Sequence, residues 1–219
     1  KSSFRMTVVT ANALDHIIDT VAPKQATDKR LPLPTERALT NAPGQGWLVP
    51  TTVKNSNIPE AGNGRFANVD IPKGTVIMSK PMTQMSDVSS LHAISYDEVI
   101  IFKNKEDLER FLDMYVKEGN QSRKDVFEYM THYIFSLSTS EGVTLNFSSA
   151  AVNHGDPGVT QNTVSYELDG KHLFKTVADV KAGDELLVNY RNYDFNQTGK
   201  FWLDFCKKEG VDDLFTNMD

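Results

Sequence analysis

An asparagine–histidine pair and a tyrosine are the residues best suited to chemistry in this sequence. Asn153 and His154 open a polar loop, and Tyr190 ends the apolar run that follows it. An amide and an imidazole offer hydrogen-bond donors and acceptors to a polar ligand. His154 also stands two residues before Asp156, but residues this close in a turn rarely hold triad geometry, and no Gly-x-Ser-x-Gly elbow accompanies them. The pair is therefore interpreted as a ligand site or a structural turn, and not as a hydrolase centre.

Two glycines mark a second candidate binding segment. Gly62 and Gly64 flank Asn63, and their lack of a side chain lets the backbone approach a ligand closely. The pattern is not a dinucleotide fingerprint, since neither a third glycine nor a helix follows it. A metal centre is not expected either, because Cys206 is the only cysteine and the five histidines show no zinc-ligand spacing.

The segment between the Asn-His pair and the tyrosine predicts a β-hairpin. Residues 163–168 and 171–176 are rich in β-branched and aromatic residues, and Asp169-Gly170 joins them. Asp-Gly between two such runs favours a type I′ turn. A second turn at 181–184 then precedes the apolar run that ends in the tyrosine, which is expected to be a strand.

Two helices are predicted upstream, after a short strand at 99–102. The first is capped by Asn104 and ends at Gly119, with an apolar stripe between them. The second starts at Ser122 and carries the longest periodic stripe of the chain, interpreted mainly as core. This stripe consists of Val126, Tyr129, Met130, Tyr133, Ile134 and Leu137.

The two ends of the chain each predict one further helix. An N-terminal stripe consists of Leu14, Ile17, Ile18 and Val21. A proline-punctuated connector follows as far as Pro50, and Trp47 within it is expected to dock on the domain. Near the C-terminus, Phe201, Trp202 and Phe205 lie on one side of a short helix that Gly210 ends.

The bulk numbers indicate one globular domain with an appendage. The chain has 219 residues, of which 39% are hydrophobic and 24% charged. A net charge of −6 argues against nucleic acid as the main partner and is compatible with a basic peptide. No apolar run reaches the length of a membrane span, so no membrane partner is expected. An intracellular location, in the nucleus or cytoplasm, is expected.

Three motifs in this order resemble the SET domain, the fold of many protein-lysine methyltransferases. They are the Gly-x-Gly loop at 61–67, the Asn-His loop at 153–158 and the strand 185–190 that ends in tyrosine. The resemblance implies a mainly β fold with inserted helices (α+β), a β-clip of small curved sheets with a threaded C-terminal segment. It implies an N-terminal helix and linker at 1–52, a catalytic domain at 53–195 with a helical insert at 80–147, and a C-terminal helix at 196–219.

The resemblance also implies an S-adenosylmethionine-dependent protein-lysine N-methyltransferase that uses no metal. Its substrate would be a protein or peptide with a target lysine, for which a basic tail is suited. Tyr190 matches the catalytic tyrosine. The implied cofactor-binding residues are Asn63, Gly64, Arg65, Phe66, Asn153, His154, Tyr190 and, as a lid over the adenine, Trp202. The implied walls of the lysine channel are Tyr133, Tyr166, Val188 and Tyr193. Each of these aromatic residues also has a plainer interpretation as core, Trp202 included.

Three departures from the family pattern keep other functions open. Gly155 replaces a serine and the loop asparagine comes only at Asn162, Arg65 stands where leucine is common, and Val188 occupies a position that is often Phe or Tyr. One alternative is a catalytically silent SET-like module that binds a peptide or protein partner. Another is a methyltransferase that acts on a non-lysine substrate. The number of methyl groups added is left open by Val188.

Overall fold

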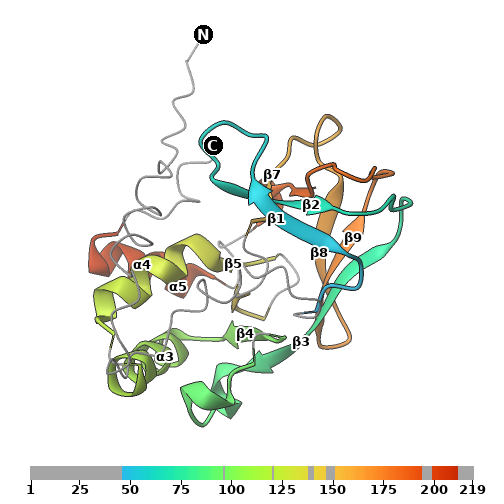
Figure 1. The fold of residues 1–219 in the computed structure, drawn as a ribbon. Coiled ribbons are helices and arrows are strands. Elements are labelled where there is room, and N and C mark those ends of the chain that lie inside the picture. The colour runs from blue at the N-terminus through green and yellow to red at the C-terminus, as the bar shows by residue number, and fades with distance from the viewer. Residues whose placement is uncertain are drawn as a thin grey trace, which may run out of the picture.

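The computed structural model is a mainly β molecule with its helices gathered on one side (Figure 1). It describes residues 46–211 apart from 96, 120, 138–140, 147–150 and 194–198. The predicted N-terminal helix and most of the connector lie outside the described residues, as do the last eight residues. None of the helices in the described part is long and apolar enough to span a membrane.

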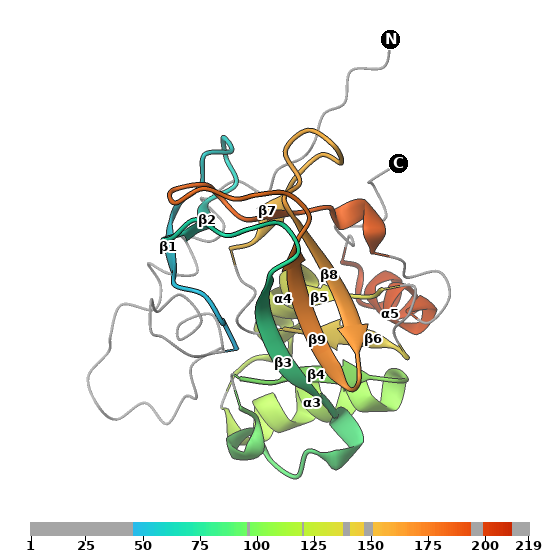
Figure 2. The ribbon, with the colours of Figure 1, turned by 90° about the vertical axis from the view of Figure 1, so that its right-hand side faces the viewer.

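The strands form one pair and one larger curved sheet. In chain order they are β1 (Thr51–Asn55), β2 (Asn63–Ala67), β3 (Val76–Gln84), β4 (Val99–Phe102), β5 (Ile134–Phe135), β6 (Val143–Leu145), β7 (Asn153–His154), β8 (Thr163–Leu168), β9 (Lys171–Thr176) and β10 (Leu187–Val188). β1 pairs with β2 alone, and the other eight follow the order β5-β6-β4-β3-β9-β8-β10-β7. The long strands β3, β9 and β8 form the curved middle of this sheet (Figure 2).

The predicted hairpin is confirmed residue by residue. β8 and β9 pair antiparallel from Thr163–Thr176 to Leu168–Lys171. Asp169 and Gly170 have φ values of 50° and 69°, the two positive angles that a type I′ turn needs. The hairpin is therefore set by local sequence, and its two strands lie in the middle of the larger sheet.

The described α-helices are α3 (Lys105–Glu118), α4 (Arg123–Tyr133) and α5 (Lys200–Glu209), and the first two begin where their caps predict. The side chain of Asn104 accepts a hydrogen bond from the Asp107 amide at 3.0 Å, and that of Ser122 accepts one from the Asp125 amide at 3.1 Å. Gly210, with φ 69°, ends α5 in the left-handed conformation.

One predicted helical stripe ends early. The sequence predicts a helix through Ile134 and Leu137, but α4 ends at Tyr133 and Ile134–Phe135 forms β5 against β6. Both stripe residues are still buried, as a core interpretation requires. The reason is that the chain must leave the helix here to pair with the sheet, and an apolar stripe does not distinguish the two outcomes.

The buried apolar residues of the described part form two clusters. The larger joins the three helices to β4, β5 and β6, and Phe111, Trp202 and Met130 are among its fully buried members. The smaller contains Ile77, Phe174 and Val188, with Trp47 packed against it. Trp47 stacks on Phe174 with ring centroids 6.2 Å apart, which confirms that the end of the connector docks on the domain.

Candidate functional site

The C-terminal strand β10 brings the candidate residues together. It lies between β7 and β8 and runs parallel to both, so that Leu187 is level with Asn153 and Val188 with His154. The expected strand is only two residues long, and Tyr190 begins the short 3-10 turn η3 (Tyr190–Asn192) beyond it. β7 and β2 lie side by side in both views (Figures 1 and 2). The Asn-His pair therefore stands between the tyrosine and the Gly-x-Gly loop.

Tyr190 is held by contacts at both ends. Its hydroxyl donates a hydrogen bond to the Val152 carbonyl at 2.7 Å, and its backbone amide donates to His154 Nδ1 at 3.0 Å. Burial raises the pKa of Tyr190, and Tyr133 and Glu185 raise it further. Its phenol is therefore neutral at physiological pH, suited to orient a reacting group by hydrogen bonding rather than to remove a proton as a phenolate.

His154 supports Tyr190 as a neutral imidazole. Burial lowers its pKa and Arg191 lowers it further, while Asp156, 3.6 Å from Nε2, acts in the opposite direction. Because Nδ1 accepts the Tyr190 amide hydrogen, the proton of the neutral ring lies on Nε2. His154 thus links the Asn-His loop directly to the tyrosine turn.

Loss of this acceptor is expected to release the tyrosine turn. His154→Ala leaves the Tyr190 amide without its partner, which should lower the free energy of unfolding by about 1–3 kcal/mol. Hydrogen exchange at the Tyr190 amide should rise, whereas His154→Asn, which restores an acceptor, should keep much of its protection. Equal protection of this amide in wild type and His154→Ala would contradict the assignment.

The Asn153 side chain faces the Gly-x-Gly loop and is engaged within the protein. Its Nδ2 lies 3.0 Å from the Asn63 carbonyl, 3.1 Å from Ser56 Oγ and 2.9 Å from Glu185 Oε1. The two amide hydrogens are shared among these three acceptors. Asn153 therefore ties the two motifs together, a structural task that the sequence did not reveal.

The residues of the Gly-x-Gly loop have different surroundings, and not all of them are open to a cofactor. Gly62 has φ 68°, and a Cβ placed on it would meet nothing within 4 Å, so the backbone is open to a ligand there. Gly64 lies against Glu185. Arg65 points elsewhere: it is buried, lies 4.4 Å from the Trp47 ring and donates to Thr51 Oγ1 at 2.9 Å. Any contact of Arg65 with a cofactor therefore has to come from its backbone.

Phe66 and the departures of the Asn-His loop have local explanations. Phe66 is buried under the Lys54 ammonium, which lies 4.0 Å from the ring centre. At Gly155 a Cβ would lie 2.7 Å from the Leu187 Cβ, so the serine of the usual pattern does not fit. Asn162 bonds the C-terminal strand from its side, donating to the Glu185 carbonyl at 2.7 Å and accepting from the Leu187 amide at 2.8 Å.

Three aromatic residues continue inward from Tyr190. Tyr193 stacks on Tyr190 with centroids 5.5 Å apart, and Phe135 lies 5.4 Å from Tyr193. Tyr133 is the third, close enough to raise the pKa of Tyr190, and burial raises the pKa of Tyr133 itself to about 12. The structure thus gathers the predicted wall residues Tyr133 and Tyr193. Phe135 was missed because the sequence pattern favours a helix there.

Tyr166 lies apart from this group. It pairs with Leu173, whereas the neighbouring pair is Glu167 with His172. Side chains of adjacent residues point to opposite faces of a strand, and His172 faces Phe135 at 4.9 Å. Tyr166 is therefore on the other face, which does not support its predicted place in the channel. Val188 is buried in the smaller cluster, directly opposite His154 in the β7–β10 pair.

Trp202 lies in the core and not over an open site. Its side chain is fully buried in the larger cluster, with its ring 5.4 Å from Phe127. Tyr133 and Tyr193 pack against the same cluster. The placement favours the packing interpretation over the predicted lid, because a buried indole has no face left for an adenine. Helix α5 instead belongs to the core against which Tyr133 and Tyr193 pack.

Trp202→Ala should consequently act on stability. Removing a buried indole leaves a large cavity, at an expected cost of about 3–5 kcal/mol in the free energy of unfolding. Chemical denaturation measures this cost. Phe201→Ala, at a half-buried neighbour on the same helix, is the matched control and should cost clearly less. A Trp202→Ala protein as stable as Phe201→Ala would show that the indole does not fill the core.

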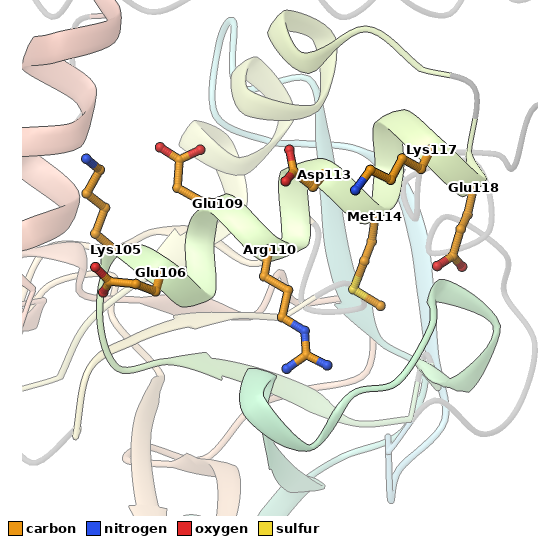
Figure 3. A pocket seen from close by; sticks show the side chains of 8 residues that line it. All are labelled: Lys105, Glu106, Glu109, Arg110, Asp113, Met114, Lys117 and Glu118. Atoms are coloured by element: carbon orange, nitrogen blue, oxygen red, sulfur yellow. The ribbon is translucent and has the colours of Figure 1, made fainter.

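The hollow drawn in Figure 3 does not mark this site. This hollow of about 560 Å³ runs along α3, away from the three motifs, and its lining is shown in Figure 3. Opposite charges alternate there, and some are already engaged: Glu109 pairs with Arg123, and Arg110 donates to backbone carbonyls. Among the described residues no group of His, Cys, Asp and Glu side chains could hold a metal ion.

Comparisons with solved structures find distant likenesses. The chain is 21% identical to a chain of apo ctPRC2 in an autoinhibited state, with a TM-score of 0.45, covering 73% of this chain and 17% of that one. It is 18% identical to a chain of ctPRC2 in an autoinhibited conformation bound to S-adenosylmethionine, with a TM-score of 0.41 and coverages of 72% and 17%. For Chaetomium thermophilum Polycomb Repressive Complex 2 bound to GSK126 the values are 20%, 0.42, 70% and 17%.

Sequence comparison is more direct. No curated protein matches the chain. The family model of the SET domain matches residues 62–191, which is more than half of the 219 residues and includes all three motifs apart from the first residue of the Gly-x-Gly loop. The chain belongs to the SET-domain family.

Proposed function

We propose that this protein is an S-adenosylmethionine-dependent protein-lysine N-methyltransferase. The observation that carries the proposal is the convergence of three distant segments by specific hydrogen bonds. His154 accepts the Tyr190 amide, and Asn153 donates to the Asn63 carbonyl. A tyrosine, a polar pair and a glycine loop are thereby held around one location.

Methyl transfer from a sulfonium to an amine is a direct displacement. The amine nitrogen must be neutral, in line with the breaking bond and about 3 Å from the methyl carbon. The reaction needs oxygen acceptors near the methyl group, an apolar channel for the lysine stem and little competing water. The displacement itself needs no metal. The chain's contribution is thus mainly positioning.

The role proposed for Tyr190 is to orient the amine of the substrate lysine. Its hydroxyl already lies next to the Val152 carbonyl at 2.7 Å, so two oxygen atoms lie together beside the start of β7. The rings of Tyr190 and Tyr193 stack with an interplanar angle of 22°, and together they offer a flat apolar wall to an alkyl stem. Tyr133 and Phe135 extend that wall.

The cofactor is assigned to the side of the Gly-x-Gly loop. Gly62 leaves its backbone open, and Asn63 and Gly64 follow it on a strand edge, where main-chain groups can pair with an amino acid moiety. S-adenosylmethionine supplies the methyl group there. Asn153 and His154 hold the surrounding segments in place through the bonds of their side chains.

The substrate proposed is a protein or peptide that presents a lysine. The net charge of −6 favours a basic segment around that lysine, because opposite charges assist the encounter. Val188, small beside the Phe or Tyr of many relatives, is the residue proposed to set how many methyl groups are added.

Calorimetric titration with S-adenosylmethionine separates this proposal from the catalytically silent module. The enzyme is expected to bind the cofactor with a stoichiometry of one per chain. A folded chain that shows no binding would favour the silent module. A chain that binds the cofactor but leaves every lysine of a peptide array unmodified would favour a methyltransferase for another acceptor.

A further inference from the structure

We propose that Glu185, a residue that the sequence motifs left without a role, positions the Gly-x-Gly loop against the Asn-His pair. The inference rests on the proposed function for what the loop binds, and on the geometry alone for how the loop is held. Glu185 stands at the start of the run leading to Tyr190, and it is buried, with only 6% of its surface exposed.

The Glu185 carboxylate accepts three hydrogen bonds from two segments far away in the chain. Oε1 accepts from Ser56 Oγ at 2.7 Å and from Asn153 Nδ2 at 2.9 Å. Oε2 accepts from the Asn57 amide at 2.9 Å. Ser56 and Asn57 follow β1 and lead into the glycine loop, so one side chain connects the start of this loop to the Asn-His strand.

The contact with the loop is also direct. A Cβ on Gly64 would overlap Glu185 Oε1, so the absence of a side chain lets the loop backbone lie against the carboxylate. The backbones are joined on either side: the Leu186 amide donates to the Arg65 carbonyl at 2.7 Å, and Phe66 bridges to Glu185. A side chain at Gly64 would therefore displace the Glu185 carboxylate from its present position.

The chemistry calls for a carboxylate rather than an amide. The Asn57 backbone N–H and the Asn153 NH₂ group can only donate, and they approach different oxygens. Glutamine has only one side-chain oxygen. In either orientation of its amide, the NH₂ group would therefore face the Asn57 amide or the Asn153 NH₂ group, both of which are donors. Glu185→Gln thus keeps the size of the side chain and removes one acceptor, which isolates the positioning task from packing.

The position of Glu185 also links the loop to the reacting tyrosine. Its negative charge contributes to the raised pKa of Tyr190, after burial and Tyr133. The two residues lie close in the chain, with β10 between them. A displacement of the Glu185 carboxylate would therefore disturb mainly the Gly-x-Gly loop and, to a smaller extent, Tyr190.

Two measurements on the intact protein test this inference. Calorimetry with S-adenosylmethionine should show a dissociation constant at least about tenfold higher for Glu185→Gln, and steady-state kinetics should show the change mainly in KM for the cofactor rather than in kcat. Ser56→Ala, which removes one of the three donors, should give a smaller change in the same direction. Hydrogen exchange without cofactor should show faster exchange of amides 56–64 in Glu185→Gln.

Thr163→Val is the matched control. Thr163 Oγ1 donates to the Leu187 carbonyl at 2.8 Å, so this change also removes one buried bond to the C-terminal strand, away from the loop. It should lower the melting temperature while leaving the cofactor affinity and amides 56–64 as in wild type. Equal loop exchange in Glu185→Gln and Thr163→Val would overturn the inference. Wild type that binds no cofactor would defeat the proposed function, and the exchange data would still decide the role of Glu185.

Discussion

Tyr190→Phe is expected to keep the fold and to lower the rate of methyl transfer by a factor of about 10²–10³, the usual effect of removing one aligned donor from a reacting centre. The change removes a single oxygen atom. The Val152 carbonyl then loses its partner at 2.7 Å, which should cost about 0.5–1.5 kcal/mol of stability. The loss of rate should therefore far exceed any loss of folded protein.

The control for this prediction is Tyr166→Phe. It removes the same hydroxyl from a half-buried tyrosine on the opposite face of the β8–β9 hairpin. Its turnover should equal that of wild type, measured with labelled S-adenosylmethionine at saturating concentrations. Wild-type turnover in Tyr190→Phe, or an equal loss in both variants, would remove Tyr190 from the reacting centre.

A second large effect is expected in the dependence of stability on pH. Lys80 and His172 are fully buried neighbours on β3 and β9. The His172 ring lies between Phe135 and Phe174, and both of its nitrogens lack a hydrogen-bond partner among the described residues. Burial lowers the pKa of His172 to about 3, with a further contribution from Lys80. Burial also lowers the pKa of Lys80 to about 7, against the opposing charges of Asp97 and Glu98.

The direction in which stability changes with pH follows from the protons that the folded and unfolded states bind. Between pH 6.5 and 3 the unfolded state takes up a proton at His172 that the folded state refuses, so stability falls as the pH is lowered through this window. Between pH 10.5 and 7 the unfolded state likewise holds a proton at Lys80 that the folded state releases, so stability should rise again from pH 7 upward. A tenfold difference in proton affinity between the folded and unfolded states corresponds to about 1.4 kcal/mol. Both windows should therefore be easily measured.

Urea denaturation between pH 4 and pH 9 tests this expectation. This pH range lies below the one in which tyrosines ionise. His172→Phe should flatten the acid side of the stability curve, and Lys80→Met should flatten the side above pH 7. Lys80→Met should also be at least as stable as wild type below pH 7, where it removes a buried charge. If the stability curves of both variants run parallel to that of wild type, neither His172 nor Lys80 is held in its neutral form.

The parts of the fold that were predictable are those with local causes. The hairpin turn follows from Asp169-Gly170, whose positive φ angles are matched by residue type. The starts of α3 and α4 follow from Asn104 and Ser122, each capping an amide three residues on. The family resemblance followed from motifs that are themselves short, and the family match confirms it.

What could not be predicted depends on contacts between distant segments. The apolar stripe after Tyr133 is compatible with helix or strand, and only pairing with β6 decides it. Alternation along β8 shows that neighbours face opposite ways but not which face meets Tyr193. The amphipathic side of α5 does not reveal whether Trp202 meets a ligand or Phe127. Glu185 has partners 128 and 129 residues away, and no local pattern indicates them.

The most direct measurement is methyl transfer itself. The intact protein is incubated with labelled S-adenosylmethionine and an array of lysine-containing peptides of graded charge, and mass spectrometry locates the added mass. We expect an increment of one methylene mass per methyl transferred, on a lysine Nζ, strongest on basic peptides and lost in Tyr190→Phe. A protein that binds the cofactor yet labels no lysine on any peptide, or labels equally well with Tyr190→Phe, would contradict it.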